Sequence, residues 1–310
     1  MPPRIAIPML HSADRKYAER GIPQYERAVR LAGGVPVRVP LDQPPAQVMK
    51  IIERCDGVLL PGSKADIDPA KFNAARSTHT ADSDPRRDTV DELLLQDAYN
   101  MRKPILGICY GLQSLNVYRT GSLVQHIPDF LPEEVRTRVN HEAGGKVAVA
   151  HSVEIEAESK LAEILCRDSR PRLSGGARLG SDSAAPSEAG SSAGPAAERR
   201  QNAAHGARSH VGCDQAPTGR KNSLVIPVNS SHHQSADVVG DGLRIVARCL
   251  EDGIIEAVEG TSPDHFVLAV QWHPERSVEE DEPSCAIFRA LVEAAAERHK
   301  QLKDEFESVK

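Results

Sequence analysis

The sequence predicts an α/β fold, with a mostly parallel central sheet, flanking helices and additional short antiparallel strands. Two observations support this prediction. Strand-like and helix-like segments alternate through residues 1–130, as they do in consecutive βαβ units. Four short strand-like segments then follow one another after residue 223. Because these later strands need partners, we expect one domain that spans residues 1–310.

The first part of the chain is expected to supply the parallel strands and their helices. Pro23 can open a helix, since its missing N–H costs nothing in the first turn, and Gly33 and Gly34 can close it. Asp84 is placed to cap a helix that begins at Pro85. Hydrophobic periodicity predicts strands at residues 4–7, 35–39, 57–60 and 105–108, and helices at residues 23–32, 47–54, 85–100 and 110–120.

The middle of the chain has a different composition. Of the 40 residues from 171 to 210, 26 are Ala, Ser, Gly or Pro, and large apolar side chains are almost absent. Such a segment cannot offset its ordering entropy by burial. The composition therefore predicts that residues 167–222 form a disordered insertion within the domain. The five arginines of residues 171–210 could contact an acidic partner, but a solvated loop is the simpler interpretation.

The last part of the chain is expected to add short strands and a helix. Residues 224–228, 243–250, 254–259 and 266–271 have the apolar content of strands. Asp252-Gly253 between two of them predicts a two-residue hairpin turn. The amphipathic pattern of residues 284–310 predicts a C-terminal helix.

Charge and cysteine content exclude several classes of function. The net charge of −6 offers no general attraction for nucleic acid or for an anionic membrane. The first residues do not resemble a signal peptide, and no apolar run reaches the ~18 residues that span a bilayer, so we expect a cytoplasmic protein. The six cysteines contain no C-x-x-C pair, which predicts free thiols.

A cysteine flanked by glycines lies where a predicted strand meets a predicted helix. Residues 107–111 read G-I-C-Y-G, the cysteine form of the nucleophile elbow, in which a sharp turn exposes the central side chain. Glycines are needed there because a Cβ would clash with the crowded backbone. The N-terminus of the helix favours the thiolate. Cys109 is therefore a candidate nucleophile, and a buried, inert cysteine is the alternative.

A second candidate segment lies far downstream, where a strand is expected to end at V-Q-W-H-P-E. A nucleophilic thiol needs a nearby base and a third group that orients the base. His273 and Glu275 can fill these two roles. A lone H-P-E would be read as a surface histidine at a strand end, but the elbow makes the functional interpretation stronger.

These segments resemble class I glutamine amidotransferase-like hydrolases, and most closely the gamma-glutamyl-gamma-aminobutyrate hydrolase family of cysteine peptidases. The resemblance covers nearly all of the chain except residues 167–222. It rests on YERAVRLAGGVPVRVP at 25–40, GVLLPGSKADIDP at 57–69, RRDTVDELLL and KPILGICYGLQSLNV within 86–128, and VNSSHHQ, DGIIEAVE and VQWHPE within 228–275.

The resemblance implies a role for each matching residue. Cys109 would be the nucleophile, His273 the general base and acid, and Glu275 the residue that orients His273. The N–H groups of Gly62 and Tyr110 would form the oxyanion hole, although the family usually has arginine at the second position. The expected contacts to the substrate come from Gln113, His233 and Gln234.

The family's activity implies a reaction without a cofactor. The expected reaction is hydrolysis of a γ-glutamyl amide through a thioester, which releases glutamate and an amine such as aminobutyrate or another polyamine product. The expected partner is the small substrate. Dimers are common in the family, so a homodimer is a further expectation, although nothing in the residues themselves predicts one.

Two alternative functions remain open. The chain could be a glutaminase subunit that passes ammonia to a synthetase, or a non-catalytic binding or scaffold protein.

His141 and His151 match a family segment near the site, and His232 precedes the matched loop residues, yet structural roles are at least as plausible for them. Because the histidines show no i, i+4 pair and no nearby cysteine cluster, no metal is expected.

Overall fold

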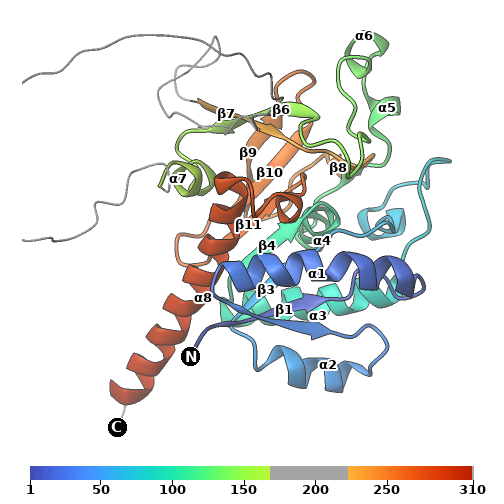
Figure 1. Cartoon of the computed structure of the whole chain (residues 1–310). Helices are drawn as coiled ribbons and strands as arrows, with labels where there is room; N and C mark the ends of the chain where they lie inside the picture. The colour runs from blue at the N-terminus through green and yellow to red at the C-terminus, as the bar shows by residue number, and fades with distance from the viewer. Residues whose placement is uncertain (168–222, 309–310) are drawn as a thin grey trace, which may run out of the picture.

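The computed structural model describes residues 1–167 and 223–308, and Figure 1 shows their arrangement. The expected insertion at 167–222 lies outside the described residues, except for Arg167, which ends a helix. Among the described residues, no helix combines the length and the apolar composition needed to cross a bilayer.

Nine strands of the described chain form one sheet in the order β2-β1-β3-β4-β11-β10-β9-β6-β7. The first five run parallel to one another, and only β10 and β6 run opposite to the other strands. The sheet is therefore mostly parallel, as expected. Its strands are β1 (Arg4–Pro8), β2 (Val35–Val39), β3 (Gly57–Leu60), β4 (Ile105–Ile108), β6 (His151–Glu156), β7 (Ser223–Val228), β9 (Leu243–Cys249), β10 (Ile255–Gly260) and β11 (Val267–Val270). A separate short ladder pairs β5 (Leu123–Val124) with β8 (Ser235–Ala236).

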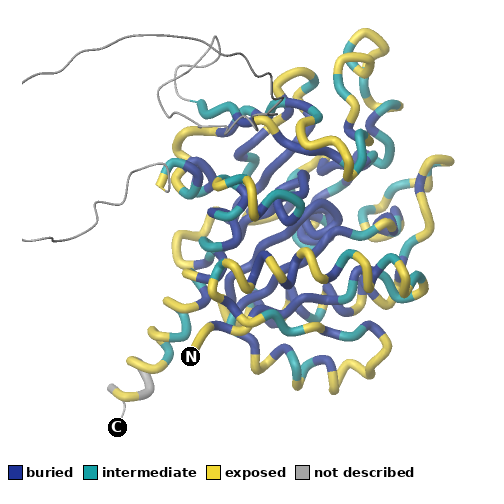
Figure 2. Tube along the Cα trace, viewed as in Figure 1, coloured by how far each residue is buried: buried dark blue, intermediate teal, exposed yellow. Residues whose placement is uncertain are grey.

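Helices cover both faces of the sheet. Neighbouring residues of one strand enter different cores: Ile5 and Ile7 of β1 pack with α1 and α8, whereas Ala6 packs with α2, α3 and α4 on the other face. Figure 2 shows the strands buried between helices whose outer turns are exposed. Burial on both faces explains why the central strands are almost continuously apolar. The helices are α1 (Arg15–Leu31), α2 (Pro45–Ile52), α3 (Pro85–Met101), α4 (Tyr110–Tyr118), α5 (Ile127–Phe130), α6 (Glu133–Arg136), α7 (Lys160–Arg167) and α8 (Glu282–Ser308), with short 3-10 turns η1 (Pro69–Phe72) and η2 (Pro274–Arg276).

The predicted start of the first helix is wrong. Helix α1 begins eight residues before Pro23, and the Asp14 side chain caps it by accepting a hydrogen bond from Tyr17 N at 3.0 Å. Pro23 lies inside the helix, where it removes one backbone hydrogen bond. The buried positions of Ala18, Ile22 and Tyr25 follow the i, i+4, i+7 spacing of one helix face, so packing against the sheet outweighs the loss of that bond.

Smaller differences concern turns and short elements. The predicted two-residue hairpin turn is wrong, because five residues, 250–254, separate β9 from β10, and Cys249 N donates to Ile254 O at 2.8 Å. Gly253 adopts the positive φ that the turn requires, at +75°. The sequence prediction assigned no element to β6 and α7, which carry residues 151–167. The predicted cap at Asp84 is confirmed, since its side chain accepts from Arg87 N.

Candidate active site

Three neighbouring parallel strands bring the candidate residues to one edge of the sheet. Strands β3, β4 and β11 lie side by side, and their carboxyl ends lead to Gly62, Cys109 and His273. A Cβ placed on Gly62 would lie 3.1 Å from His273 Cε1 and 3.7 Å from Cys109 Cβ. Residues separated by more than 200 positions in the sequence therefore meet in one small region.

Cys109 occupies a strained turn between β4 and α4. It precedes the first residue of α4 and has φ 53° and ψ −106°, a conformation that side-chain-bearing residues rarely adopt. Its N–H donates to Val270 O at 2.8 Å. A Cβ on Gly111 would lie 2.1 Å from Leu60 O, and one on Gly107 would lie 2.8 Å from Gly111 O. Both glycines are thus required by the close approach of β3, β4 and α4, as the sequence predicted.

His273 is held by a buried carboxylate. Its Nδ1 lies 2.8 Å from Glu275 Oε1, and both side chains are buried. Burial disfavours the imidazolium, but the Glu275 carboxylate and the nearby Cys109 sulfur favour it more and raise the pKa of His273 to about 9. The same pairing lowers the pKa of Glu275 despite its burial. At neutral pH the arrangement favours a protonated imidazole beside Cys109.

Asn229 fixes the backbone of His273 from a different strand end. Its Nδ2 donates to His273 O and its Oδ1 accepts from His273 N, each at 2.9 Å. Asn229 is buried and begins the loop that follows β7. The sequence analysis assigned no role to this residue, although it belongs to the quoted VNSSHHQ segment.

The N–H groups of the two expected oxyanion donors, Tyr110 and Gly62, differ in their hydrogen-bond partners. Tyr110 is the first residue of α4, so its N–H has no acceptor within the helix. The N–H of Gly62 instead donates to Tyr25 Oη at 3.1 Å. Burial raises the pKa of Tyr25 well above its ordinary value, so the hydroxyl keeps its proton. A substrate oxygen would have to share or replace the contact between Gly62 and Tyr25.

A buried arginine supports the loop that carries Gly62. Arg87 Nη2 donates to Pro61 O at 2.7 Å, and its Nε pairs with Asp91 Oδ1 at 2.7 Å, with both side chains fully buried. The guanidinium also lies 4.9 Å from the centre of the Tyr110 ring. Tyr110 Oη donates to Asp88 Oδ1 at 2.5 Å. The side chain of Tyr110 therefore points into a structural network, and only its N–H remains for the site.

Of the three expected substrate-binding residues, Gln113 lies on α4, and His233 and Gln234 lie in the loop between β7 and β8. Gln113 Nε2 donates to Gln234 O at 3.2 Å and to Gln271 Oε1 at 3.4 Å. Gln234 is buried and its own side chain donates to Gln125 O at 3.2 Å. The half-buried His233 pairs with Asp66 Oδ1 at 3.1 Å, and this bond raises the pKa of His233. Gln113 and Gln234 thus contact each other, while His233 contacts Asp66 in the loop after β3.

The fold, the family model and the relatives together identify a glutamine amidotransferase-like hydrolase. A solved structure of a GMP synthase component from Thermoplasma acidophilum superposes with a TM-score of 0.54 at 14% identity, over 98% of each chain. The chain belongs to the Peptidase C26 family, whose model matches residues 5–174 and 197–275. This confirms the family resemblance predicted from the sequence motifs.

Two relatives illustrate the range of names within the family. The glutamine amidotransferase-like protein RP404 of Rickettsia prowazekii is 29% identical over 87% of this chain and 87% of its own length. The gamma-glutamyl-gamma-aminobutyrate hydrolase PuuD of Escherichia coli K12 is 27% identical over 94% of this chain and 93% of its own length. Both similarities extend over most of this chain and most of each relative.

Proposed function

We propose that this protein hydrolyses γ-glutamyl amide bonds with Cys109 as nucleophile, His273 as general base and acid, and Glu275 as the residue that orients His273. The observation that carries the proposal is the convergence of Cys109 and His273 at adjacent strand ends, with Glu275 Oε1 2.8 Å from His273 Nδ1. This is the arrangement that an activated thiol requires.

The reaction follows from the positions of these groups. The Cys109 thiolate attacks the γ-carbonyl carbon, and the N–H groups of Tyr110 and Gly62 stabilise the negative oxygen that forms. The His273 imidazolium then gives its proton to the departing amine, which leaves a γ-glutamyl thioester. Neutral His273 next removes a proton from water, and the hydroxide attacks the thioester to release glutamate. Loss of one oxyanion donor typically slows such reactions by about 10²–10³.

A γ-glutamyl-γ-aminobutyrate-like substrate is supported by the similarity to PuuD over nearly the whole chain. Gln113, His233 and Gln234 are proposed to contact the substrate, because Gln113 lies on the helix that follows Cys109, Gln234 contacts Gln113, and His233 contacts Asp66 in the loop that also carries Gly62. The amine would then come from polyamine breakdown.

The direct test is a panel of γ-glutamyl amines, with released glutamate and amine measured by mass spectrometry. Wild-type protein should hydrolyse at least one of them, and Cys109→Ala should lower the rate by about 10³ or more. Cys285→Ala, which alters a half-buried thiol of α8, is the matched control and should keep full activity. Retained activity in Cys109→Ala would refute the proposal.

A glutaminase subunit is the second candidate, favoured by the amidotransferase-like name of the RP404 relative. It would use the same residues on glutamine and pass ammonia to a synthetase. Comparing glutamine with γ-glutamyl amines, in purified protein and in cell extract, separates the two functions. A glutaminase rate that rises only in extract would favour the second candidate.

A further inference from the structure

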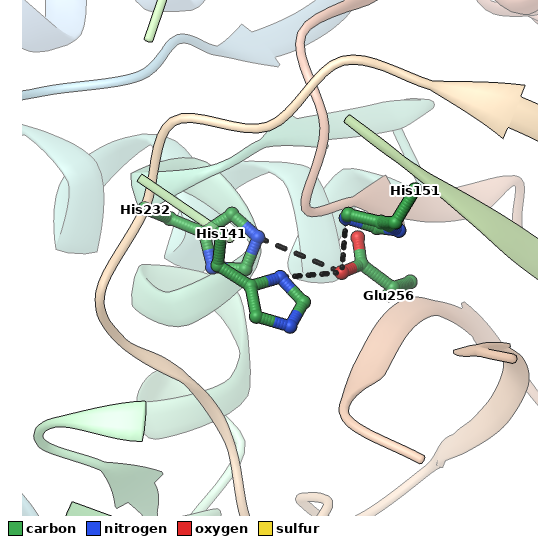
Figure 3. A group of neighbouring side chains, drawn as sticks. All are labelled: His141, His151, His232 and Glu256. Carbon is green, nitrogen blue, oxygen red and sulfur yellow. Dashed lines mark ion pairs between the residues drawn. The ribbon is translucent and has the colours of Figure 1, made fainter. Parts of the chain in front are cut away.

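Four buried side chains outside the proposed catalytic group converge on one point, as Figure 3 shows. His141 precedes β6, His151 begins β6, His232 follows β7, and Glu256 lies on β10. The distances to Glu256 Oε1 are 3.5 Å from His141 Nδ1, 3.3 Å from His151 Nε2 and 3.5 Å from His232 Nε2. None of the four side chains is more than 4% exposed.

The inner atoms of this cluster lack hydrogen-bond partners within the described part of the chain. This holds for both oxygens of Glu256 and for the inward nitrogens His141 Nδ1, His151 Nε2 and His232 Nε2. A buried carboxylate without donors is costly, because burial removes its hydration and nothing replaces it. Five unpartnered polar atoms around one point indicate that something else compensates them.

The outer nitrogens of two of these histidines contact hydrogen-bond acceptors. His141 Nε2 lies 2.8 Å from Asp252 Oδ2, and His232 Nδ1 lies 2.9 Å from Gln234 O. Both partners are acceptors, so each outer nitrogen carries a proton, and in a neutral ring the inward nitrogen then offers a lone pair. Lone pairs then face the Glu256 carboxylate. Outer acceptors that orient imidazoles in this way are typical of metal-ligating histidines.

The spacing fits a four-coordinate metal ion. Zinc bound at ~2.0–2.1 Å in a regular tetrahedron separates its ligand atoms by about 3.3–3.4 Å. The three nitrogen-to-oxygen distances, 3.3–3.5 Å, lie close to this value, and all four ligand atoms lie within 4.8 Å of one another. The same distances are longer than the 2.7–3.2 Å expected of N–H···O hydrogen bonds.

We propose that His141, His151, His232 and Glu256 bind one zinc ion. Three imidazoles and one carboxylate suit zinc, and four protein ligands leave no open position, which is the pattern of a structural site. The sequence analysis expected no metal, because the histidines show no i, i+4 pair and no nearby cysteine cluster. His141 and His232 also line a cavity of about 480 Å³.

The zinc would fasten the loop after β7 to the sheet. That loop already contacts His141, whose carbonyl accepts from Ser230 Oγ and His232 N, each at 2.8 Å. The same loop begins with Asn229, which holds the backbone of His273. The ion would thus stabilise the loop that positions His273 without contacting the substrate.

The test measures the metal directly in the full-length protein. Protein purified without chelators is analysed for metal content, then stripped with a chelator and titrated with zinc chloride while thermal unfolding is followed. We expect about one zinc per chain and a Tm that rises by about 5 °C or more at a hundredfold excess over Kd. Stripped wild-type protein that neither binds zinc nor gains thermal stability would overturn the proposal.

Variants identify the ligands. Glu256→Gln and His151→Asn should weaken zinc binding by about a hundredfold or more. His265→Asn removes a buried histidine that instead contacts Lys103 O, so it controls for lost packing and should bind zinc normally. His79→Ala disrupts a second group, His79, His126 and Asp129, which is more exposed and should also leave binding intact. Binding that disappears only in His79→Ala would overturn the proposal.

A further measurement does not depend on variants that fold. X-ray absorption of the zinc-loaded wild-type protein should show four nitrogen or oxygen neighbours at ~2.0–2.1 Å, with outer scattering from three imidazole rings. Sulfur in the inner shell, or six oxygen neighbours without imidazole scattering, would exclude the proposed site.

Discussion

The charge of Glu275 is expected to control the protonation of His273, and Glu275→Gln tests this. The amide can still accept a hydrogen bond from His273 Nδ1 but carries no charge. In the wild-type structure the pKa of His273 is raised from 6.5 to about 9, chiefly by Glu275 among the groups that favour the charged form. Removing the charge should return that pKa toward or below its ordinary value.

The size of the effect on stability follows from the raised pKa of His273. A difference of about 2.5 pH units corresponds to on the order of 3 kcal/mol of preference for the charged imidazole. Because the folded-state pKa is raised, this stabilisation is complete below pH 6.5 and disappears as the pH rises through about 9. The free energy of unfolding of the wild-type protein should therefore fall across that pH interval, and that of Glu275→Gln should fall much less.

Activity and thiol reactivity provide the assays. We expect kcat for γ-glutamyl amide hydrolysis to fall by about 10²–10⁴ in Glu275→Gln, as when the carboxylate of a catalytic triad is neutralised. Alkylation of Cys109 by iodoacetamide at neutral pH, read from its own peptide by mass spectrometry, should be slower than in the wild-type protein, because a charged imidazole no longer lies beside the sulfur. The control Glu280→Gln, at an exposed position close in the sequence, should change neither kcat nor the alkylation of Cys109. Unchanged kcat and an unchanged alkylation profile in Glu275→Gln would refute the reasoning.

Two further variants test the residues that support the site. Arg87→Ala leaves the buried Asp91 carboxylate unpaired, so the free energy of unfolding measured by thermal denaturation should fall by about 3–5 kcal/mol. The control Arg86→Ala changes an exposed residue and should leave the free energy of unfolding unchanged. Equal stabilities of the two variants would contradict the role of the buried pair. Gly111→Ala would place a Cβ 2.1 Å from Leu60 O, so activity should fall by at least about 10². Gly145→Ala, with no neighbouring atom closer than 3.7 Å, is its control, and comparable rates would show that the elbow tolerates a side chain.

Local sequence patterns predicted much of the fold because the strands are short, apolar and separated by clear turns. The segments that became β2, β3 and β4 were expected at the bounds the structure has. The elbow at Cys109 was also predictable, since its glycines record a close approach between backbone segments. Features that depend on adjacent residues can thus be inferred from the chain alone.

Features that depend on distant contacts could not be inferred. Pro23 carries the local signal of a helix start, but burial of Ala18 and Ile22 against the sheet extends the helix toward its true cap at Asp14. The Tyr25 contact to Gly62 joins residues 37 positions apart. Neither partner has a local pattern that reveals the other.

The group of His141, His151, His232 and Glu256 shows the same limit most clearly. Its members lie on separate segments that meet only when β6, β7, β9 and β10 pair. Metal motifs recognised from sequence rely on regular spacing within one element, which these residues lack. The burial of all four side chains becomes visible only in the folded chain.

The central claim is that Cys109 is the activated thiol at the carboxyl edge of the sheet. The most direct measurement is labelling of the native protein with 6-diazo-5-oxonorleucine, a glutamine analogue that alkylates activated cysteines, followed by peptide mass spectrometry. We predict one adduct, on Cys109, that forms together with loss of activity and is prevented by a γ-glutamyl substrate. Inactivation with the adduct on another cysteine, or full labelling of Cys109 with activity retained, would contradict the account.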